Sequence, residues 1–169
     1  TRPDLKSKLV NQYTDVIVEG FPRSANTFLV TALQMSTDQK INLAHHVHDP
    51  CQFLSNNRRS VPTVIVVREP ADAISSWRIK NSSIHLSTMF YIYVRFYREV
   101  LKIIHSPNVH LVDYEEAVSF PDRVVGRILA WTGHQYESDV KLDVERVFDE
   151  IDRKKEQRQD ETLNQNGFQ

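Results

Sequence analysis

The segment from Gly20 to Phe28 carries residues that could bind a phosphate group. It follows the apolar run Asp15–Glu19, which predicts a buried strand, and it precedes a helical pattern that ends at Met35. The first N–H groups of a helix lack intrahelical partners and lie at the positive end of the helix dipole, so they attract anions. Arg23 adds a cation. Short polar side chains come from Ser24, which is the expected N-cap, and from Asn26 and Thr27.

The same segment differs from the phosphate loop of nucleoside triphosphatases. That loop needs a second Gly followed by Lys and then Ser or Thr, and this sequence lacks the combination. A P-loop kinase or ATPase is therefore disfavoured. Taken alone, the segment is equally compatible with an ordinary polar turn between a strand and a helix.

Three histidines lie at the end of the second predicted strand, Ile41–Val47. The unperturbed pKa of histidine is about 6.5, which suits a proton acceptor near neutral pH. Because side chains alternate along a strand, His46 and His48 should share one face and His45 should point to the other. A zinc site would need a fourth ligand that is not evident in the sequence, so we expect no metal.

Arg68 and Ser76 give a third chemical signal. The continuous apolar run Val61–Val67 is typical of a central strand in a parallel sheet, and Arg68 follows its end. Ser76 comes eight residues later in a predicted helix, so both side chains could hold one phosphate group, although Arg68 could also form a surface ion pair. Ligands of such sheets bind beyond the carboxyl ends of the strands, so all three segments should converge on one edge.

Together these segments resemble the cytosolic and bacterial sulfotransferases, which use PAPS (3′-phosphoadenosine 5′-phosphosulfate). The family loop, approximately Pro-Lys/Arg-Ser-Gly-Thr-Thr-Trp/Phe, is matched by residues 22–28, and Arg-Asn-Pro-x-Asp-x-x-x-Ser is matched by residues 68–76. The family's Tyr-Glu-Asp-Leu, Pro and Gly are matched by Tyr114–Ala117, Pro121 and Gly133. The matches occur in the right order and cover most of the chain.

The resemblance implies transfer of a sulfuryl group from PAPS to a hydroxyl or amine of a small-molecule or carbohydrate acceptor, with PAP as the product and no metal. His46 would be the catalytic base, with His48 as the second candidate. Arg23 would stabilise the charge that grows on the leaving oxygen. The residues implied in PAPS binding are Pro22, Arg23, Ser24, Ala25, Asn26, Thr27, Phe28, Arg68 and Ser76.

Individual contacts to PAPS also follow from the resemblance. The backbone N–H groups of Asn26 and Thr27 would hold the 5′-phosphate, and Phe28 would lie against the adenine. Arg68 and Ser76 would bind the 3′-phosphate, which separates a PAPS site from an ATP site.

Departures from the family pattern leave other functions open. The family's late Arg-Lys-Gly loop, which closes the 3′-phosphate site, is not found, and Arg153, Lys154 and Lys155 instead place cations on a predicted helix. Ala44 stands where the family has a Lys before its catalytic His. The alternatives are a non-catalytic nucleotide-binding module of the same fold and, less favoured, a kinase-like phosphotransferase.

Strands and helices alternate along the chain. A fourth strand is predicted over 109–112, and helices are predicted over 24–35, 51–56, 71–77, 87–104, 121–133 and 140–151. This alternation predicts a three-layer α/β fold, with a central parallel sheet of about four to five strands flanked by helices, like that of P-loop NTPases. The expected core stripe of the longest helix is Phe90, Tyr93, Tyr97 and Leu101. Residues 1–152 should form one domain, followed by a polar, mobile tail over 153–169.

The composition fits a soluble globular protein, with 40% hydrophobic and 25% charged residues and a formal net charge of −1. Such a charge argues against broad binding to nucleic acid or to an anionic membrane, and no run approaches the roughly 18 apolar residues of a membrane span. Cys51 is the only cysteine and no signal peptide is visible, so we expect a cytoplasmic location. A homo-oligomer and a segment preceding Thr1 both stay open.

Overall fold

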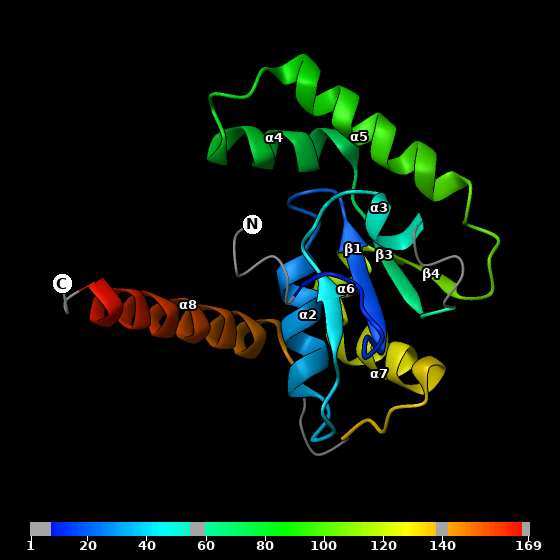
Figure 1. The fold of residues 1–169 in the computed structure, drawn as a ribbon, viewed down its shortest axis with the longest axis vertical. Helices are drawn as coiled ribbons and strands as arrows, with labels where there is room; N and C mark the ends of the chain where they lie inside the picture. The colour runs from blue at the N-terminus through cyan, green and yellow to red at the C-terminus, as the bar shows by residue number, and fades with distance from the viewer. Residues whose placement is uncertain (1–7, 55–59, 138–141, 167–169) are drawn as a thin grey trace.

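A computed structural model describes residues 8–54, 60–137 and 142–166 of the chain, and its centre is a parallel β-sheet (Figure 1). All neighbouring strands pair in parallel, in the order β2-β1-β3-β4. The strands are β1 (Val16–Gly20), β2 (Leu43–His45), β3 (Thr63–Val67) and β4 (Val109–Asp113). The predicted α/β fold with a parallel sheet is confirmed.

The central strands are mainly apolar and are buried along almost their whole length because both of their faces are covered. Successive residues of β1 and β3, such as Val64 and Ile65, are fully buried although they point to opposite faces. The second strand is shorter than predicted. It ends at His45 because the next residue, His46, has a φ of 60°, which takes the chain out of the extended conformation.

Helices lie on both sides of the sheet, which gives the expected three layers (Figure 1). On one face, Val64 and Val66 of β3 pack in a core with residues of four helices: α2 (Asn26–Met35), α6 (Tyr114–Ser119), α7 (Pro121–Thr132) and α8 (Val144–Asn166). On the other face, Ile65 packs against α3 (Cys51–Leu54) and α5 (Leu86–Leu101). Helix α4 (Pro70–Lys80) packs with α5 around Phe21, beyond the carboxyl end of β1.

The buried stripe of α5 differs from the predicted one. Met89, Phe96 and Val100 are buried, whereas Phe90 and Leu101 are exposed. Tyr93 and Tyr97 do pack against the core, as expected. The error arose because the helix contacts α4 at one end and the sheet at the other, so no single stripe of side chains faces one apolar surface.

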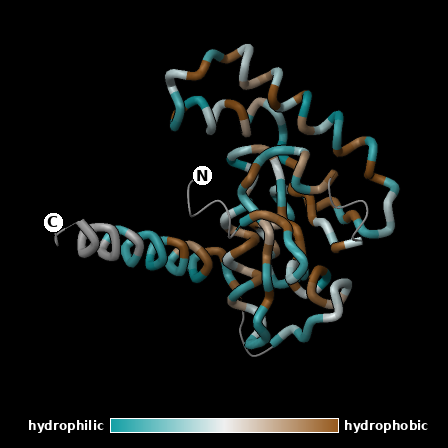
Figure 2. The backbone as a smooth tube through the Cα atoms, viewed as in Figure 1, coloured by the Kyte–Doolittle hydropathy of each residue, from teal (hydrophilic) through white to brown (hydrophobic). Residues whose placement is uncertain are grey.

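Helix α8 is longer than predicted and leaves the body of the molecule (Figure 1). Its first turns are anchored by Val147 and Ile151, which are buried in the core, and the residues that follow are mainly hydrophilic (Figure 2). The helix continues to Asn166, so the backbone of the predicted polar tail is helical up to that residue. The mobility of this tail stays a prediction.

None of the helices in the described part of the chain combines the length and apolar character that crossing a membrane requires.

Candidate functional site

The β1–α2 loop (residues 21–25) ends in a helix start that no side chain caps. Arg23 and Ala25 adopt left-handed conformations, with φ values of 70° and 59°. The N-cap is Ala25, so the prediction of Ser24 as the cap was wrong: the left-handed backbone starts the helix later and turns Ser24 into the interior, where it is fully buried. Without a side-chain cap, the first N–H groups of α2 can bind an anion.

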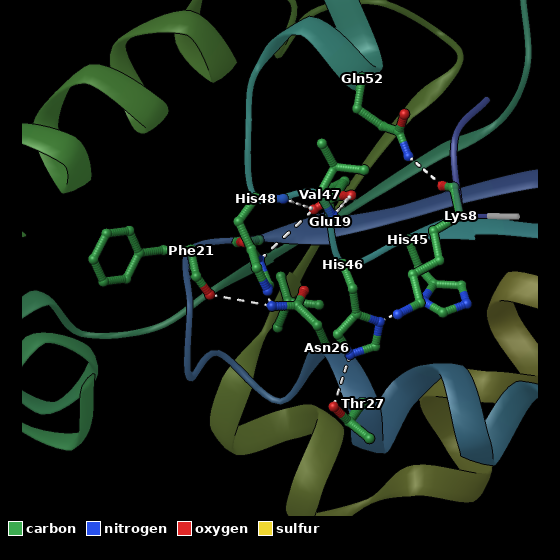
Figure 3. Close-up of polar contacts among 12 residues, drawn as sticks. Lys8, Glu19, Phe21, Asn26, Thr27, His45, His46, Val47, His48 and Gln52 are labelled. Atoms are coloured by element: carbon green, nitrogen blue, oxygen red, sulfur yellow. Dashed lines mark hydrogen bonds and ion pairs between the residues drawn. The ribbon is translucent and has the colours of Figure 1, made fainter. Parts of the chain in front are cut away.

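Gly20 and Asn26 fix the shape of this loop. A Cβ at Gly20 would lie 2.7 Å from the Val66 carbonyl oxygen and 2.8 Å from Asn26 Oδ1, so only glycine fits. Asn26 Nδ2 donates a hydrogen bond of 3.1 Å to the Phe21 carbonyl oxygen (Figure 3). The Asn26 side chain therefore braces the loop.

The structure brings Arg23, Arg68 and Ser76 into one hydrogen-bonded group. Arg23 Nε donates to Ser76 Oγ at 3.0 Å, and Arg68 Nη1 donates to the Arg23 carbonyl oxygen at 2.7 Å. Arg68 follows β3 directly, and Ser76 lies on α4. The two side chains that the sequence paired thus meet at the β1–α2 loop, beyond the carboxyl ends of two neighbouring strands.

Arg68 retains an unused hydrogen-bond donor. Its guanidinium lies over the ring of Tyr114, 4.0 Å from the centroid, and its carbonyl oxygen accepts a 2.8 Å hydrogen bond from Tyr93 Oη. Arg68 Nε is buried and has no hydrogen-bond partner in the described part of the chain. A buried, unpaired donor on a cation is costly unless an anion satisfies it.

The β2–α3 loop (residues 46–50) places His46 beside the start of α2. His46 Nε2 lies 2.7 Å from Thr27 Oγ1 (Figure 3). The ring of His45 packs against that of His46, with centroids 4.6 Å apart, so the prediction that His45 points to the opposite side was wrong. The alternation of side chains ends at His45, because His46 and His48 both have positive φ values.

His48 is partly buried, and a hydrogen bond fixes its ring. Its Nδ1 donates to the Gly20 carbonyl oxygen at 2.8 Å, which leaves Nε2 as the acceptor of a neutral ring. Burial lowers the pKa of His48. This ring therefore braces the two loops, whereas His46 lines a cavity and is the better placed of the two candidate bases.

Glu19 is a site residue that the sequence reasoning missed. Its side chain is fully buried and accepts hydrogen bonds from the backbone N–H groups of Val47 (2.9 Å) and His48 (3.0 Å) (Figure 3). Burial raises the pKa of Glu19 to about 7, although these hydrogen bonds lower it. The sequence did contain a signal for this role. Glu19 is an acidic residue at the end of a predicted buried strand, and a buried carboxylate needs hydrogen-bond partners.

Phe28 is not exposed to the site. Only 3% of its surface is accessible, and its ring lies 5.4 Å from the ring of Phe148 on α8. Its orientation fits a core residue and does not offer a ring face to an adenine. Thr27 is exposed and Pro22 is half-buried in the same segment.

A cavity of about 270 Å³ lies beside His46, between the end of β2, helix α2 and helix α8. Thr27, Lys154 and Lys155 are among its lining residues. Arg153, by contrast, pairs with Glu150 on the same helix. Two of the three late cations seen in the sequence are thus brought to the candidate base. No group of three potential metal ligands is found in the described ranges.

Comparison with known proteins relates the fold to one group of enzymes. No protein-family model and no curated protein sequence matches the chain. Among solved structures, mouse sulfotransferase SULT7A1 complexed with PAP aligns with a TM-score of 0.59 and 13% identity, over 80% of this chain and 64% of that one. This chain therefore spans less than two thirds of the mouse protein.

Two further structures show the same likeness. Retinol dehydratase in complex with androsterone and PAP has a TM-score of 0.57 and 13% identity, over 86% of this chain and 68% of that one. A sulfotransferase from Alicyclobacillus acidocaldarius has a TM-score of 0.54 and 10% identity, over 84% of this chain and 90% of that one. With the parallel sheet and its flanking helices, these alignments show that the chain has the fold of PAPS-dependent sulfotransferases.

Proposed function

We propose that the chain binds PAPS and transfers its sulfuryl group to a hydroxyl or amine acceptor. The observation that carries this proposal is the meeting of Arg23, Arg68 and Ser76 at the uncapped start of α2. A single phosphate would need only part of this set. Two cations, a hydroxyl and a helix start together suit a ligand with two separate phosphate groups.

The residues present fit the donor. The unpaired Nε of Arg68, together with Ser76, would hold the 3′-phosphate, and the first N–H groups of α2 would hold the 5′-phosphate. When PAPS binds, Arg23 would exchange its hydrogen bond with Ser76 for contact with the bridging oxygen between the 5′-phosphate and the sulfuryl group. The adenine would then need a surface other than the buried ring of Phe28.

These positions support one transfer step. His46 Nε2 takes the proton of the acceptor hydroxyl while the acceptor oxygen forms a bond to sulfur. The bond between sulfur and the bridging oxygen breaks, and its electron pair remains on that oxygen. Arg23 stabilises this charge as it develops. Thr27 Oγ1, which is 2.7 Å from His46 Nε2, orients the ring before the acceptor binds.

The test is calorimetric titration with PAP and with adenosine 5′-monophosphate, which lacks only the 3′-phosphate. We expect PAP to bind at least about tenfold more tightly, because charge-assisted hydrogen bonds contribute about 1.5–3 kcal/mol each. Arg68→Ala and Ser76→Ala should each reduce this preference and leave binding of the monophosphate nearly unchanged. Equal binding of the two nucleotides to the unmodified chain would remove the donor assignment.

The missing Arg-Lys-Gly loop favours one alternative, a nucleotide-binding module without catalysis. The late cations of the sequence lie on helix α8 instead. Binding of PAP without consumption of PAPS, across phenol, amine and sugar acceptors, would support this alternative.

A further inference from the structure

We propose that the acceptor is itself an anion: a hydroxyl compound with a carboxylate or sulfate group, bound in the cavity beside His46 by Lys154 and Lys155. This inference rests on the proposed function, since it concerns the acceptor of the same reaction. It uses two lysines to which the transfer step assigns no role.

The cavity has the right place and size for an acceptor. Its volume of about 270 Å³ is close to the lower end, roughly 300 Å³, of small-molecule sites. His46 and Thr27 form one part of its wall, and Lys154 and Lys155 form another. An acceptor lying across the cavity would reach His46 with its hydroxyl group and the lysines with its other end.

The sheet topology separates this cavity from the proposed 3′-phosphate site. Strands β2 and β3 lie on opposite sides of β1. Arg68 follows β3, whereas His46 follows β2, so the two residues flank the β1–α2 loop from different sides. A donor with its 3′-phosphate on Arg68 would leave the cavity for a second molecule, with His46 between them.

The charge of the lining selects the chemistry of that molecule. Three lysines and two histidines line the cavity, and no carboxylate among the described residues does. Lys154 is half-buried and donates a 3.0 Å hydrogen bond to Gln34 Oε1 of α2, which holds its ammonium group against the cavity wall. Lysines gathered around a concave surface create a positive potential, so a negatively charged acceptor gains binding free energy there and a neutral one does not.

Existing ion pairs leave these lysines available to a ligand. Lys155 pairs with Asp152 one turn earlier on α8, and both side chains are more than half exposed. Lys154 lies 3.5 Å from Glu150, which also pairs with Arg153. The exposed pair of Lys155 contributes little free energy, so an anion in the cavity can replace it at low cost. Lys154 is partly buried and shares Glu150 with Arg153, so Glu150 keeps a cationic partner when Lys154 turns to a ligand.

The test compares 4-hydroxybenzoate with 4-hydroxybenzamide, which has nearly the same shape but no charge. Binding to the full chain is measured by NMR titration, with and without saturating PAP. The variants are the double change Lys154→Gln and Lys155→Gln and, as a matched control, Arg153→Gln, because Arg153 lies on the same helix but does not line the cavity.

We expect the unmodified chain to prefer the carboxylate by about tenfold, as one charge-assisted hydrogen bond would give. The double variant should lose most of this preference for the carboxylate and should bind the amide as well as the unmodified chain does. The Arg153→Gln variant should keep the preference. Equal binding of the two compounds overturns the proposal, as does a preference that survives in the double variant. Displacement of the carboxylate by PAP also overturns it, because the lysines would then belong to the nucleotide site.

These outcomes are separate from failure of the proposed function. Residues of the chain alone line the cavity, so the preference for the carboxylate is measurable even if PAP does not bind. If PAP binds, mass spectrometry of the products formed from PAPS gives a second readout. The ratio of kcat/KM for the two compounds should then follow the ratio of their affinities in each variant.

Discussion

At the scale of single residues, the two histidines of the β2–α3 loop have different surroundings and should respond differently to the same substitution. His46→Gln should lower kcat by about 10²–10⁴-fold, the usual contribution of a general base, and leave PAP affinity nearly unchanged. His48→Gln should mainly lower thermal stability, because it disturbs the partly buried hydrogen bond to the Gly20 carbonyl oxygen.

Steady-state kinetics and thermal melting of both variants check this assignment. A His48→Gln protein that melts like the unmodified chain but turns over as slowly as His46→Gln would reverse the two roles.

Glu19 should make stability depend on pH. Burial raises its pKa from 4.5 to about 7, so between these values the folded chain holds a proton that the unfolded chain has released. The unfolded state then binds fewer protons, and the free energy of unfolding falls as pH rises from about 4.5 to about 7. His48, whose pKa burial lowers, acts in the opposite direction: its contribution is lost as the pH falls below its ordinary value of 6.5.

Comparison with Glu19→Gln isolates the contribution of this carboxyl group. The Gln side chain also changes one of the two hydrogen-bond acceptors of Glu19. The two proteins are therefore compared by how steeply their free energies of unfolding change with pH. Relative to the variant, the unmodified chain should lose about 3 kcal/mol of stability across this pH range. Urea unfolding of both proteins at several pH values measures the difference. Parallel stability curves would show that Glu19 titrates as an ordinary exposed carboxyl group.

At the scale of elements, the start of α2 carries strain that the sequence did not reveal. Ala25 has a φ of 59°, a conformation that favours glycine, and it offers no side-chain cap. Ala25→Gly should therefore raise stability by about 1 kcal/mol. Denaturant unfolding measures this gain. Ala32→Gly, in the interior of the same helix, is the matched control and should lower the stability. If Ala25→Gly also lowers the stability, the loop is not strained at Ala25.

The elements themselves were largely predictable, and their ends were not. Continuous apolar runs such as Val61–Val67 identify central strands because both faces of those strands are buried. Positive φ values at Ala25 and His46 moved a helix start and a strand end, and non-glycine residues give little sign of that conformation. The prediction that His45 and His46 point to opposite sides failed for the same reason, because the positive φ of His46 ends the strand.

At the scale of the whole molecule, the convergence of the three predicted segments followed from the rule that ligands bind at the carboxyl edge of a parallel sheet. Hydrogen bonds of Arg23 to Ser76 and of His46 to Thr27 confirm that they meet. The cavity was not predictable, because it depends on where α8 docks. That docking joins residues far apart in the sequence, such as Gln34 and Lys154.

Docking of α8 should therefore matter both for stability and for the cavity. Val147 is fully buried in the core shared with α2, so Val147→Ala should lower the free energy of unfolding by about 2 kcal/mol. Lys155→Ala, at an exposed position of the same helix, should change it by less than about 0.5 kcal/mol. Chemical denaturation of the two variants makes the comparison. Equal effects would mean that α8 is not part of the cooperative core.

Left-handed backbone conformations gather at the two loops of the candidate site. Of the five described non-glycine residues with positive φ, four are Arg23, Ala25, His46 and His48. Strain of this kind costs free energy and persists only where the surrounding structure enforces it. Selection for thermal tolerance alone would therefore tend to relax these loops first, whereas substitutions in α5 or α7 could add stability at no cost to the site. The two loops mark where heat resistance and activity would compete during evolution.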